Sequence, residues 1–380
     1  MIQPIDTSDN PDFPTRDGNH LEMLINGQEI FPRMLQAIRD ARHSISLETY
    51  VYWAGEIAVE FAESLARAAK RGVIVRVVLD WYGSKKMDRG LIERMDQAGV
   101  KVRHFRPLKW YDLKRSNQRT HRKLMVVDGQ VGFTGGVGIA EEWTGDAEDP
   151  QHWRDNHYQL RGPIVGDMQR LFFAHWEEDD RPEAQDKRFY PTLKPEGNLE
   201  CRLIAAEPSE GENLIERIYL DMLAKAEERF LAVAPYFAPS ETIIAELVKA
   251  AKRGVKVEVI AAGENNDMRV VRKAFRHDWG DLLEAGVDIY EYNRTLIHVK
   301  MLIVDEKQLL IGSSNFDIRS LRINSEACIL IEDKSWIQKH AEVFADDRQL
   351  SEKISYEQWK SRPPLMKAKD RLSHTLRDFL

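Results

Sequence analysis

The chain has 380 residues, of which 43% are hydrophobic and 31% charged, with 55 Lys and Arg against 62 Asp and Glu. This composition is ordinary for a folded globular chain and excludes one that is mainly disordered. The net charge of -7 argues against wholesale non-specific wrapping of nucleic acid, although it is compatible with a local basic patch. Cys201 and Cys328 are the only cysteines. They cannot form a disulfide framework and lack metal-ligand spacing, so we expect two reduced thiols.

The N-terminal residues are polar and acidic, which predicts a loose tail and not a signal peptide. No stretch reaches the roughly 18 consecutive apolar residues of a membrane-spanning helix. We therefore expect an intracellular protein that does not cross a membrane but can act on one.

Several short segments of the chain occur twice in the same order. AAKRGV is found at residues 68–73 and again at 250–255, each time closing an amphipathic helix and preceding a β-type run, VIVRVVLD or VKVEVIAA. SISLETYVYW and FLAVAPYFAP lie before these helices, and QAGVKVRHF and EAGVDIYEY follow the strands. Several ordered pairs indicate an internal duplication.

Each copy is predicted as strand, helix, strand, helix, strand and then a β-hairpin. This order indicates an α/β fold with a mostly parallel or mixed sheet and helices on its faces. We predict a tail over 1–18, a first half over 19–180, a polar linker over 181–198, a second half over 199–360 and an amphipathic helix over 361–380. That last helix is basic and fits either a membrane surface or the protein's own surface.

The most informative matching segments begin at two histidines. HRKLMVVDGQVGFTGGVG starts at His121 and HVKMLIVDEKQLLIGSSN at His298, and both read His-x-Lys, four residues, Asp, six residues, Gly. Because KLMVVD and KMLIVD are apolar and β-branched, we expect each motif to lie on a strand with its His and Lys on one face. An imidazole beside an ammonium suits phosphate chemistry, since one group attacks or protonates while the other neutralises oxygen charge.

The remaining positions of the motif predict supporting roles. Asp128 and Asp305 have the opposite parity and sit where each strand turns, so we expect them to hold the turn or pair with a distant base. Small residues at 135–136 and 312–314 would let backbone N–H groups approach an anion, and we take Gly136 and Ser313 as substrate-binding.

The doubled motif resembles that of the phospholipase D superfamily. The stretches LETYVYW, WRDNHYQLRGP, APYFAP and GSSNFDIRSLRINSE are most similar to the bacterial cardiolipin synthase branch, and the resemblance runs from about Gly18 over nearly the whole chain. It implies two tandem phospholipase D-like α/β/α sandwich halves with the active site at their interface. It also implies a two-step transfer. One His attacks the phosphodiester to form a phosphohistidine, the other protonates the leaving alcohol, and a second alcohol or water then takes the phosphoryl group. No metal or cofactor is expected, because two Lys supply the charge.

The resemblance also assigns residue roles. His121 is the expected nucleophile, and we expect Asp155 to hold its ring and Glu326 to hold that of His298. One position departs from the family pattern: the second motif ends in Asn315, a phosphate donor, where the first has Gly138. Losing one such donor could cost about 1.5–3 kcal/mol. The full candidate catalytic set is His121, Lys123, Asp128, Asp155, His298, Lys300, Asp305, Asn315 and Glu326.

A basic, aromatic segment precedes the first motif. Between Arg103 and Lys123 lie eight Lys or Arg and one Asp, interleaved with aromatic residues. Such a segment suits an anionic lipid interface, and it also suits single-stranded nucleic acid or a merely solvated loop. We include Trp110, Tyr111 and Arg119, with Tyr236 of APYFAP, among the expected substrate-binding residues.

The sequence therefore predicts a phosphatidyltransferase that makes cardiolipin from phosphatidylglycerol, releases glycerol and associates peripherally with the inner face of the cell membrane. One chain would suffice for one active site, with no obligate protein or nucleic acid partner. The alternatives are a hydrolytic phospholipase D that produces phosphatidic acid, a phosphodiesterase of nucleic acid, and a catalytically silent lipid-binding scaffold.

Overall fold

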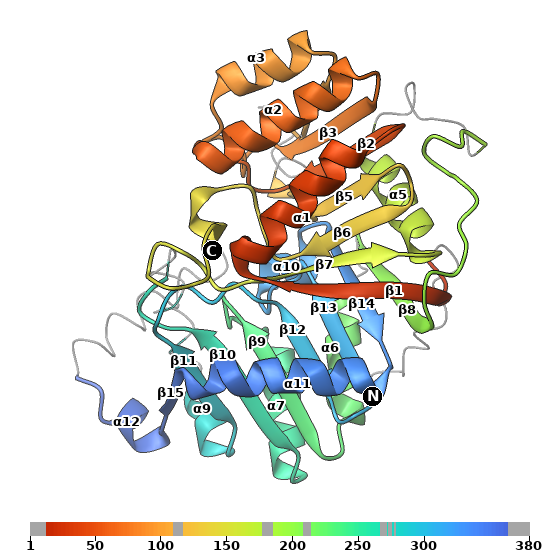
Figure 1. The fold of residues 1–380 in the computed structure, drawn as a ribbon. Helices are drawn as coiled ribbons and strands as arrows, with labels where there is room; N and C mark the ends of the chain where they lie inside the picture. The colour runs from red at the N-terminus through yellow and green to blue at the C-terminus, as the bar shows by residue number, and fades with distance from the viewer. Residues whose placement is uncertain are drawn as a thin grey trace.

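The structure is a computed structural model that describes residues 13–108, 117–176, 185–207, 214–266, 272, 276 and 279–363. Its strands form a single mixed sheet in the order β15-β11-β10-β9-β12-β13-β14-β8-β1-β7-β6-β5-β2-β3-β4, which runs through the whole molecule (Figure 1). The predicted α/β class with a mixed sheet is confirmed.

The first half supplies seven strands of this sheet. Its elements are β1 (Arg16–Ile25), α1 (Asn26–Asp40), β2 (Ser44–Thr49), α2 (Glu56–Lys70), β3 (Ile74–Asp80), α3 (Arg89–Gln97), β4 (Lys101–Phe105), β5 (Leu124–Val127), β6 (Val131–Gly135), the short 3-10 helix η2 (Glu141–Trp143), β7 (Asn156–Arg161) and α5 (Ile164–His175). Strands β2, β3 and β4 are parallel, whereas β5 pairs antiparallel with β2. Since β1 begins at Arg16, the tail predicted over 1–18 is too long by a few residues.

The second half repeats this order. Its elements are β8 (Leu199–Ala206), α6 (Leu214–Lys225), β9 (Arg229–Ala234), α7 (Glu241–Lys252), β10 (Lys256–Ala262), α9 (Trp279–Glu284), β11 (Asp288–Tyr292), β12 (Met301–Val304), β13 (Gln308–Gly312), α10 (Ile318–Arg322), β14 (Glu326–Ile331), α11 (Lys334–Gln349), β15 (Ser351–Ile354) and α12 (Tyr356–Lys360). The two AAKRGV segments end α2 and α7, and Gly72 and Gly254 follow with φ of 93° and 94°. Both are left-handed positions that favour glycine after a helix.

The two halves join through their first strands. β1 and β8 pair antiparallel, with Arg16 opposite Cys201 and Asn19 opposite Leu199. Outward from this pair, the strands of the two halves follow in matching order, so that β7 corresponds to β14, β5 to β12 and β2 to β9. The duplication thus appears in the structure as an approximate twofold relation centred on β1 and β8.

Apolar helix faces cover the sheet. In α2, Ile57, Phe61, Leu65 and Ala68 recur at helical spacing and are all buried, as the sequence predicts. Helices α1, α2 and α3 lie beside the first-half strands, and α11 runs across those of the second half (Figure 1). The largest cluster of buried apolar side chains includes residues from both halves, which makes the join a packed core.

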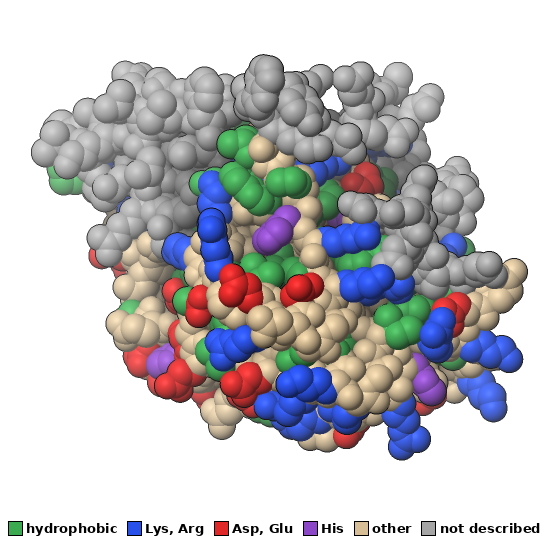
Figure 2. Space-filling model, turned by 90° about the horizontal axis from the view of Figure 1, so that it is seen from above, with side chains coloured by type: hydrophobic (Ala, Val, Ile, Leu, Met, Phe, Trp, Pro, Cys, Tyr) green, Lys and Arg blue, Asp and Glu red, His purple; other side chains and the backbone are tan. Residues whose placement is uncertain are grey.

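One face of the molecule brings basic and hydrophobic side chains together (Figure 2). Seen from above, Lys and Arg side chains lie on both sides of a strip of hydrophobic side chains next to a histidine (Figure 2). Among the residues that the structure describes, no helix is both long and apolar enough to cross a bilayer. The C-terminal helix predicted over 361–380 lies almost wholly outside the described residues.

Candidate active site

Both His-x-Lys motifs lie just before a strand. β5 begins at Leu124 and β12 at Met301, so the expectation that His and Lys themselves lie on the strand is wrong by a few residues. The reason is that each segment leaves its own half at this point. Thr120 forms an isolated parallel bridge with Ser325, and Ile297 forms the equivalent bridge with Arg154. Each histidine is thereby drawn toward the other half.

This crossing sets the partner of each ring, and it reverses the predicted pairing. The Nδ1 atom of His121 lies 2.9 Å from Oε1 of Glu326, and Nδ1 of His298 lies 2.7 Å from Oδ2 of Asp155. The predicted pairs, His121 with Asp155 and His298 with Glu326, are therefore wrong. That pairing assumed that each histidine stays with the following strand of its own half, whereas the bridges place it beside the other half's carboxylate.

Each carboxylate is fixed by further donors. Asp155 accepts from the Trp143 indole N–H at 2.9 Å, and Glu326 accepts from the Ser313 hydroxyl at 2.5 Å. Burial opposes the ionisation of Asp155 and Glu326, but the adjacent histidines and lysines outweigh it, so both carboxyl pKa values stay below their ordinary range. An ionised carboxylate at Nδ1 holds the ring N–H there and directs the bare Nε2 away from it.

The lysines bring two positive charges into the same buried site. Burial, with a further contribution from the nearby lysines, outweighs the carboxylates and lowers the pKa of His121 to about 4 and that of His298 to about 3. Burial also lowers the pKa of Lys123 to about 8 and that of Lys300 to about 7. A site with neutral rings and crowded ammonium groups is poised to accept an anion, whose charge would relieve this repulsion.

The two histidines differ in the contact of the ring with the neighbouring lysine. Lys300 Nζ lies 2.8 Å from Nδ1 and 3.0 Å from Nε2 of His298 and donates to that residue's own carbonyl at 2.6 Å. Lys123 instead donates to the carbonyl of His121, and the hydrogen bonds of the His121 ring to described residues are both at Nδ1. The lone pair of His121 is therefore the one that is open to an electrophile.

Aromatic side chains wall the site. Tyr50 meets His121 edge-on at 5.2 Å between ring centroids, and Trp143 meets His298 at 5.1 Å. Trp153 and Tyr236 complete the wall at 5.7 and 6.3 Å from His298. Tyr236, predicted from the sequence to bind substrate, thus lies at the site, while the roles of Tyr50 and the two tryptophans were missed.

The aspartates of the two motifs accept hydrogen bonds from backbone N–H groups. Asp128 has a φ of 53° at the turn between β5 and β6, and its carboxylate accepts from the backbone N–H groups of residues 42–44. Asp305 has the same φ and accepts from residues 227–229. Both therefore hold the start of the neighbouring antiparallel strand, β2 or β9, and do not contact His121 or His298.

The small residues after each motif behave differently from the prediction. The N–H of Gly136 donates to Asn156 and that of Ser313 to Ala327, so neither is available to a phosphate. These groups belong to the sheet edge because β6 and β13 continue pairing with β7 and β14 up to this point. Asn315 is buried, and its Oδ1 has no hydrogen-bond partner among the described residues.

Gly138 occupies a space with no room for the asparagine of the second half. A Cβ there would lie 2.7 Å from Cβ of Val51 and 3.2 Å from Cζ3 of Trp143. Trp143 in turn binds Asp155 and packs on His298. In the first half, the Trp143 ring therefore takes the space that a side chain matching Asn315 would need.

An ionic cluster, buried except for Glu207, lies beside the first motif. His175 lies between Glu48 at 2.6 Å and Glu207 at 2.9 Å, and Arg122, which is fully buried, pairs with Glu207. Thr120 donates to Glu48, so both neighbours of His121 in the sequence are anchored in this cluster. The sequence analysis missed it. The matching positions of the second half are apolar, Val233 for Glu48 and Val299 for Arg122, and that contrast was the available signal.

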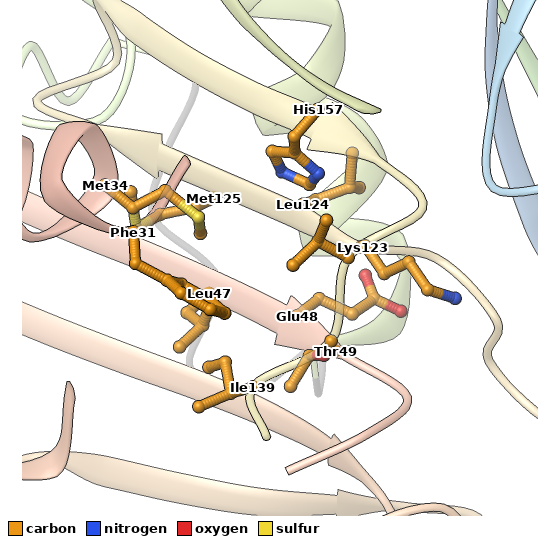
Figure 3. Close-up of a pocket in the computed structure, with 12 residues that line it drawn as sticks. Phe31, Met34, Leu47, Glu48, Thr49, Lys123, Leu124, Met125, Ile139 and His157 are labelled. Carbon is orange, nitrogen blue, oxygen red and sulfur yellow. The ribbon is translucent and has the colours of Figure 1, made fainter. Parts of the chain in front are cut away.

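A small pocket opens beneath Lys123 in the first half. Figure 3 shows apolar side chains of α1, β2 and β5, among them Phe31 and Met34, on one side of it, with Glu48 and Lys123 at the other. His157 also lines this pocket, and its Nδ1 is buried without a hydrogen-bond partner. Gly138 and Ile139 contribute to the lining, so this pocket belongs to the active site.

The basic segment before the first motif is only partly described. Trp110 and Tyr111 lie outside the described residues. Arg119 is buried, lies 3.7 Å from Asp80 and donates to the carbonyl of Arg106 at 2.9 Å. These contacts assign Arg119 to the protein's own framework, in contrast to the substrate-binding role expected from the sequence.

Comparisons with known proteins agree with this geometry. The family model described as "Cardiolipin synthase, PLD-like domain" matches residues 34–148 and 219–348. A cardiolipin synthase of Geobacillus kaustophilus is 33% identical over 97% of this chain and 74% of its own length, and the major cardiolipin synthase of Bacillus subtilis is 30% identical over 96% and 76%. The crystal structure of phosphatidylserine synthase from Haemophilus influenzae superposes with a TM-score of 0.73 over 95% of both chains at 14% identity, which shows the fold alone.

Proposed function

Because the chain belongs to the cardiolipin synthase family of PLD-like proteins, we propose that it is a phosphatidyltransferase that makes cardiolipin from two phosphatidylglycerol molecules and releases glycerol. The observation that carries this proposal is the pair of buried histidines, each held at Nδ1 by a carboxylate from the opposite half. Two lysines beside them supply the charge that a phosphodiester needs.

In the first step, Nε2 of His121 attacks the phosphorus of phosphatidylglycerol. A P–N bond forms, the P–O bond to the headgroup glycerol breaks, and His298 gives its proton to the departing glycerol oxygen. The open Nε2 of His121 supports its role as nucleophile. The Lys300 ammonium lies within 3.0 Å of both ring nitrogens of His298, which makes this ring the less suited to attack and leaves it the role of acid and base.

The lowered histidine pKa values fit this division when substrate is considered. The lowered pKa values keep both rings neutral near pH 7, as the nucleophile requires. A bound phosphodiester anion offsets the lysine charge and raises the pKa of His298, so that this ring takes up a proton in the complex. In the second step, His298 removes the proton from a hydroxyl of the second lipid, whose oxygen attacks phosphorus and frees His121.

The proposal also states where the enzyme acts and how many chains form one active site. Both substrates are membrane lipids, so the chain would act peripherally at the inner face of the cell membrane. Cys201 and Cys328 are both free, which agrees with a reducing compartment. Both histidines and both carboxylates come from one chain, and one copy would therefore suffice for one site.

Lipid mass spectrometry on purified protein with phosphatidylglycerol vesicles tests the activity. We expect cardiolipin and free glycerol from the unmodified chain, and neither product from His121→Ala or His298→Ala. His20→Ala, which removes an exposed imidazole from β1, is the matched control and should retain activity. Phosphatidic acid as the sole product would instead establish a hydrolase with the same machinery, and lipid turnover by either active-site variant would contradict a shared site.

A substrate with a good leaving group separates the two histidines. A phosphatidyl ester of p-nitrophenol needs little help from an acid, so His298→Ala should still release about one equivalent of nitrophenol and retain the phosphatidyl group on the protein. His121→Ala should do neither. The opposite pattern would make His298 the nucleophile.

A further inference from the structure

The loop after β3 carries exposed aromatic and basic side chains. Tyr82 is 58% exposed, and Lys85 Nζ lies 4.4 Å from the ring centre of Trp81 and 4.5 Å from that of Tyr82. Lys86 Nζ lies 3.9 Å from the ring centre of Trp53. These four-to-five ångström contacts hold ammonium groups on aromatic faces at the surface of the protein.

The loop lies on the active-site edge of the sheet. β3 is parallel to both β2 and β4, so the segments that follow these strands emerge at one edge. The N–H of Trp81 donates to Phe105 at the end of β4, and beyond it Leu108 is 57% exposed. The same edge holds His121, since β5 pairs antiparallel with β2 and the histidine precedes β5.

Rigid contacts tie the loop to the catalytic segment. Asp80 accepts from the N–H groups of Tyr82 and Gly83 at 2.9 Å each, and its other oxygen accepts from the N–H of Thr120 at 3.0 Å. A Cβ on Gly83 would lie 2.2 Å from the carbonyl of Tyr50, whose ring faces His121. The exposed side chains therefore stand at a fixed distance from the reacting histidine.

Directly after β10, Gly263, Glu264, Asn265 and Asn266 include neither an aromatic nor a basic side chain. Farther along, Arg272 and Arg276 lie 2.7 and 4.0 Å from Glu291, so these guanidinium groups pair within the protein. Among the described residues, the segment after β10 therefore lacks the exposed ring and lysine contacts that follow β3.

Building on the proposed function, we infer that Trp53, Trp81, Tyr82, Lys85, Lys86 and Leu108 form a docking surface for an anionic phospholipid bilayer. Tryptophan and tyrosine rings settle among headgroups, and lysine ammonium groups bind lipid phosphates. Contact through this surface would present the active-site edge to the membrane. Lipid headgroups could then reach His121 with little displacement from the bilayer.

Vesicle binding by the full chain tests the surface directly. Phosphatidylcholine vesicles containing half phosphatidylglycerol should bind the unmodified protein, and Lys85→Ala with Lys86→Ala should weaken that binding roughly 30-fold. Lys249→Ala with Lys252→Ala on α7 is the matched control and should bind normally. Unchanged binding by the Lys85 and Lys86 variant would overturn the inference, as would preferential binding of a single-stranded oligonucleotide through the same lysines.

Turnover of monomeric short-chain phosphatidylglycerol separates docking from catalysis. The Lys85 and Lys86 variant should process this dissolved substrate within about twofold of the unmodified protein, since no membrane contact is needed. A parallel loss on dissolved substrate would place these lysines in the substrate site and overturn a docking role. If the unmodified protein binds vesicles but turns over neither form, the proposed function fails while the surface stands.

Discussion

Gly138, which stands where the second half has Asn315, allows a test of how the two halves differ at the active site. If its lack of an amide were a defect, Gly138→Asn would restore a phosphate donor and raise turnover. The structure predicts the opposite, because a Cβ at this position would lie 2.7 Å from Cβ and 3.1 Å from Cγ1 of Val51, and 3.2 Å from the ring of Trp143. The first of these distances is too short for any side chain without movement of the surroundings.

The expected cost follows from what must move. Overpacking of a tight core typically removes about 1–3 kcal/mol from the free energy of unfolding. Displacement of Trp143 would also weaken its hydrogen bond to the Asp155 carboxylate, which is worth about 1.5–3 kcal/mol for a charged acceptor. Because Asp155 orients His298, we expect turnover to fall roughly tenfold or more.

Urea unfolding and steady-state lipid turnover measure the two effects. Gly138→Ala should show most of the loss in stability, since the clash begins at Cβ. Asn315→Gly, the reciprocal change in the second half, should lower turnover while largely preserving the fold. Normal stability together with faster turnover in Gly138→Asn would refute the steric argument and favour a missing donor.

Three further outcomes follow from the site. Glu326→Gln removes the charge that sustains the basicity of His121, so turnover should fall about 10- to 150-fold with little change in KM; an unaffected rate would show that the crossed pairing is not used. His175→Gln should lower the free energy of unfolding by about 1–3 kcal/mol. The pKa of His175 is raised in the folded protein, so its charged form stabilises the fold at pH 6, and this stabilisation is lost as the pH rises through the raised pKa. The difference in free energy of unfolding between the unmodified protein and His175→Gln, measured in urea, should therefore be smaller at pH 9. Asp305→Ala should cost stability through three unpaired backbone N–H groups, yet the turnover of the folded fraction should stay within about threefold.

Local patterns predicted the architecture well because they are repeated. The AAKRGV segments mark equivalent helix ends, and the buried positions of α2 fall at the predicted helical spacing. The parity argument for Asp128 also describes its position, since its carboxylate turns away from His121 toward the backbone of residues 42–44. Such inferences require only neighbours in the sequence.

The partner of each histidine required information that the motif does not contain. Asp155 and Glu326 occupy equivalent positions, so either assignment satisfies the sequence equally well. The decision rests on two isolated bridges between segments more than 140 residues apart, in which Thr120 lies beside Ser325 and Ile297 beside Arg154. A twofold arrangement of the halves produces the exchange, and no spacing within one half reveals it.

The ionic cluster around His175 could not be predicted from the sequence for a different reason. Glu48 lies on β2 and Glu207 directly follows β8, and nothing in the sequence distinguishes their charges from those of surface residues. Only alignment of the two halves singles out Glu48 and Arg122, because valine stands at both matching positions. Burial of a paired charge in one copy alone indicates that the copies no longer perform the same task.

The antiparallel contact between β1 and β8 explains how such divergence is possible. A single half that met a second copy of itself through this strand would form a symmetric dimer, and each copy's histidine would receive the other's carboxylate. In that ancestor-like assembly, any substitution enters both sides at once. Covalent fusion removes the constraint: one half can carry Gly138 while the other carries Asn315 at the matching position, and the two halves can divide attack and protonation between them.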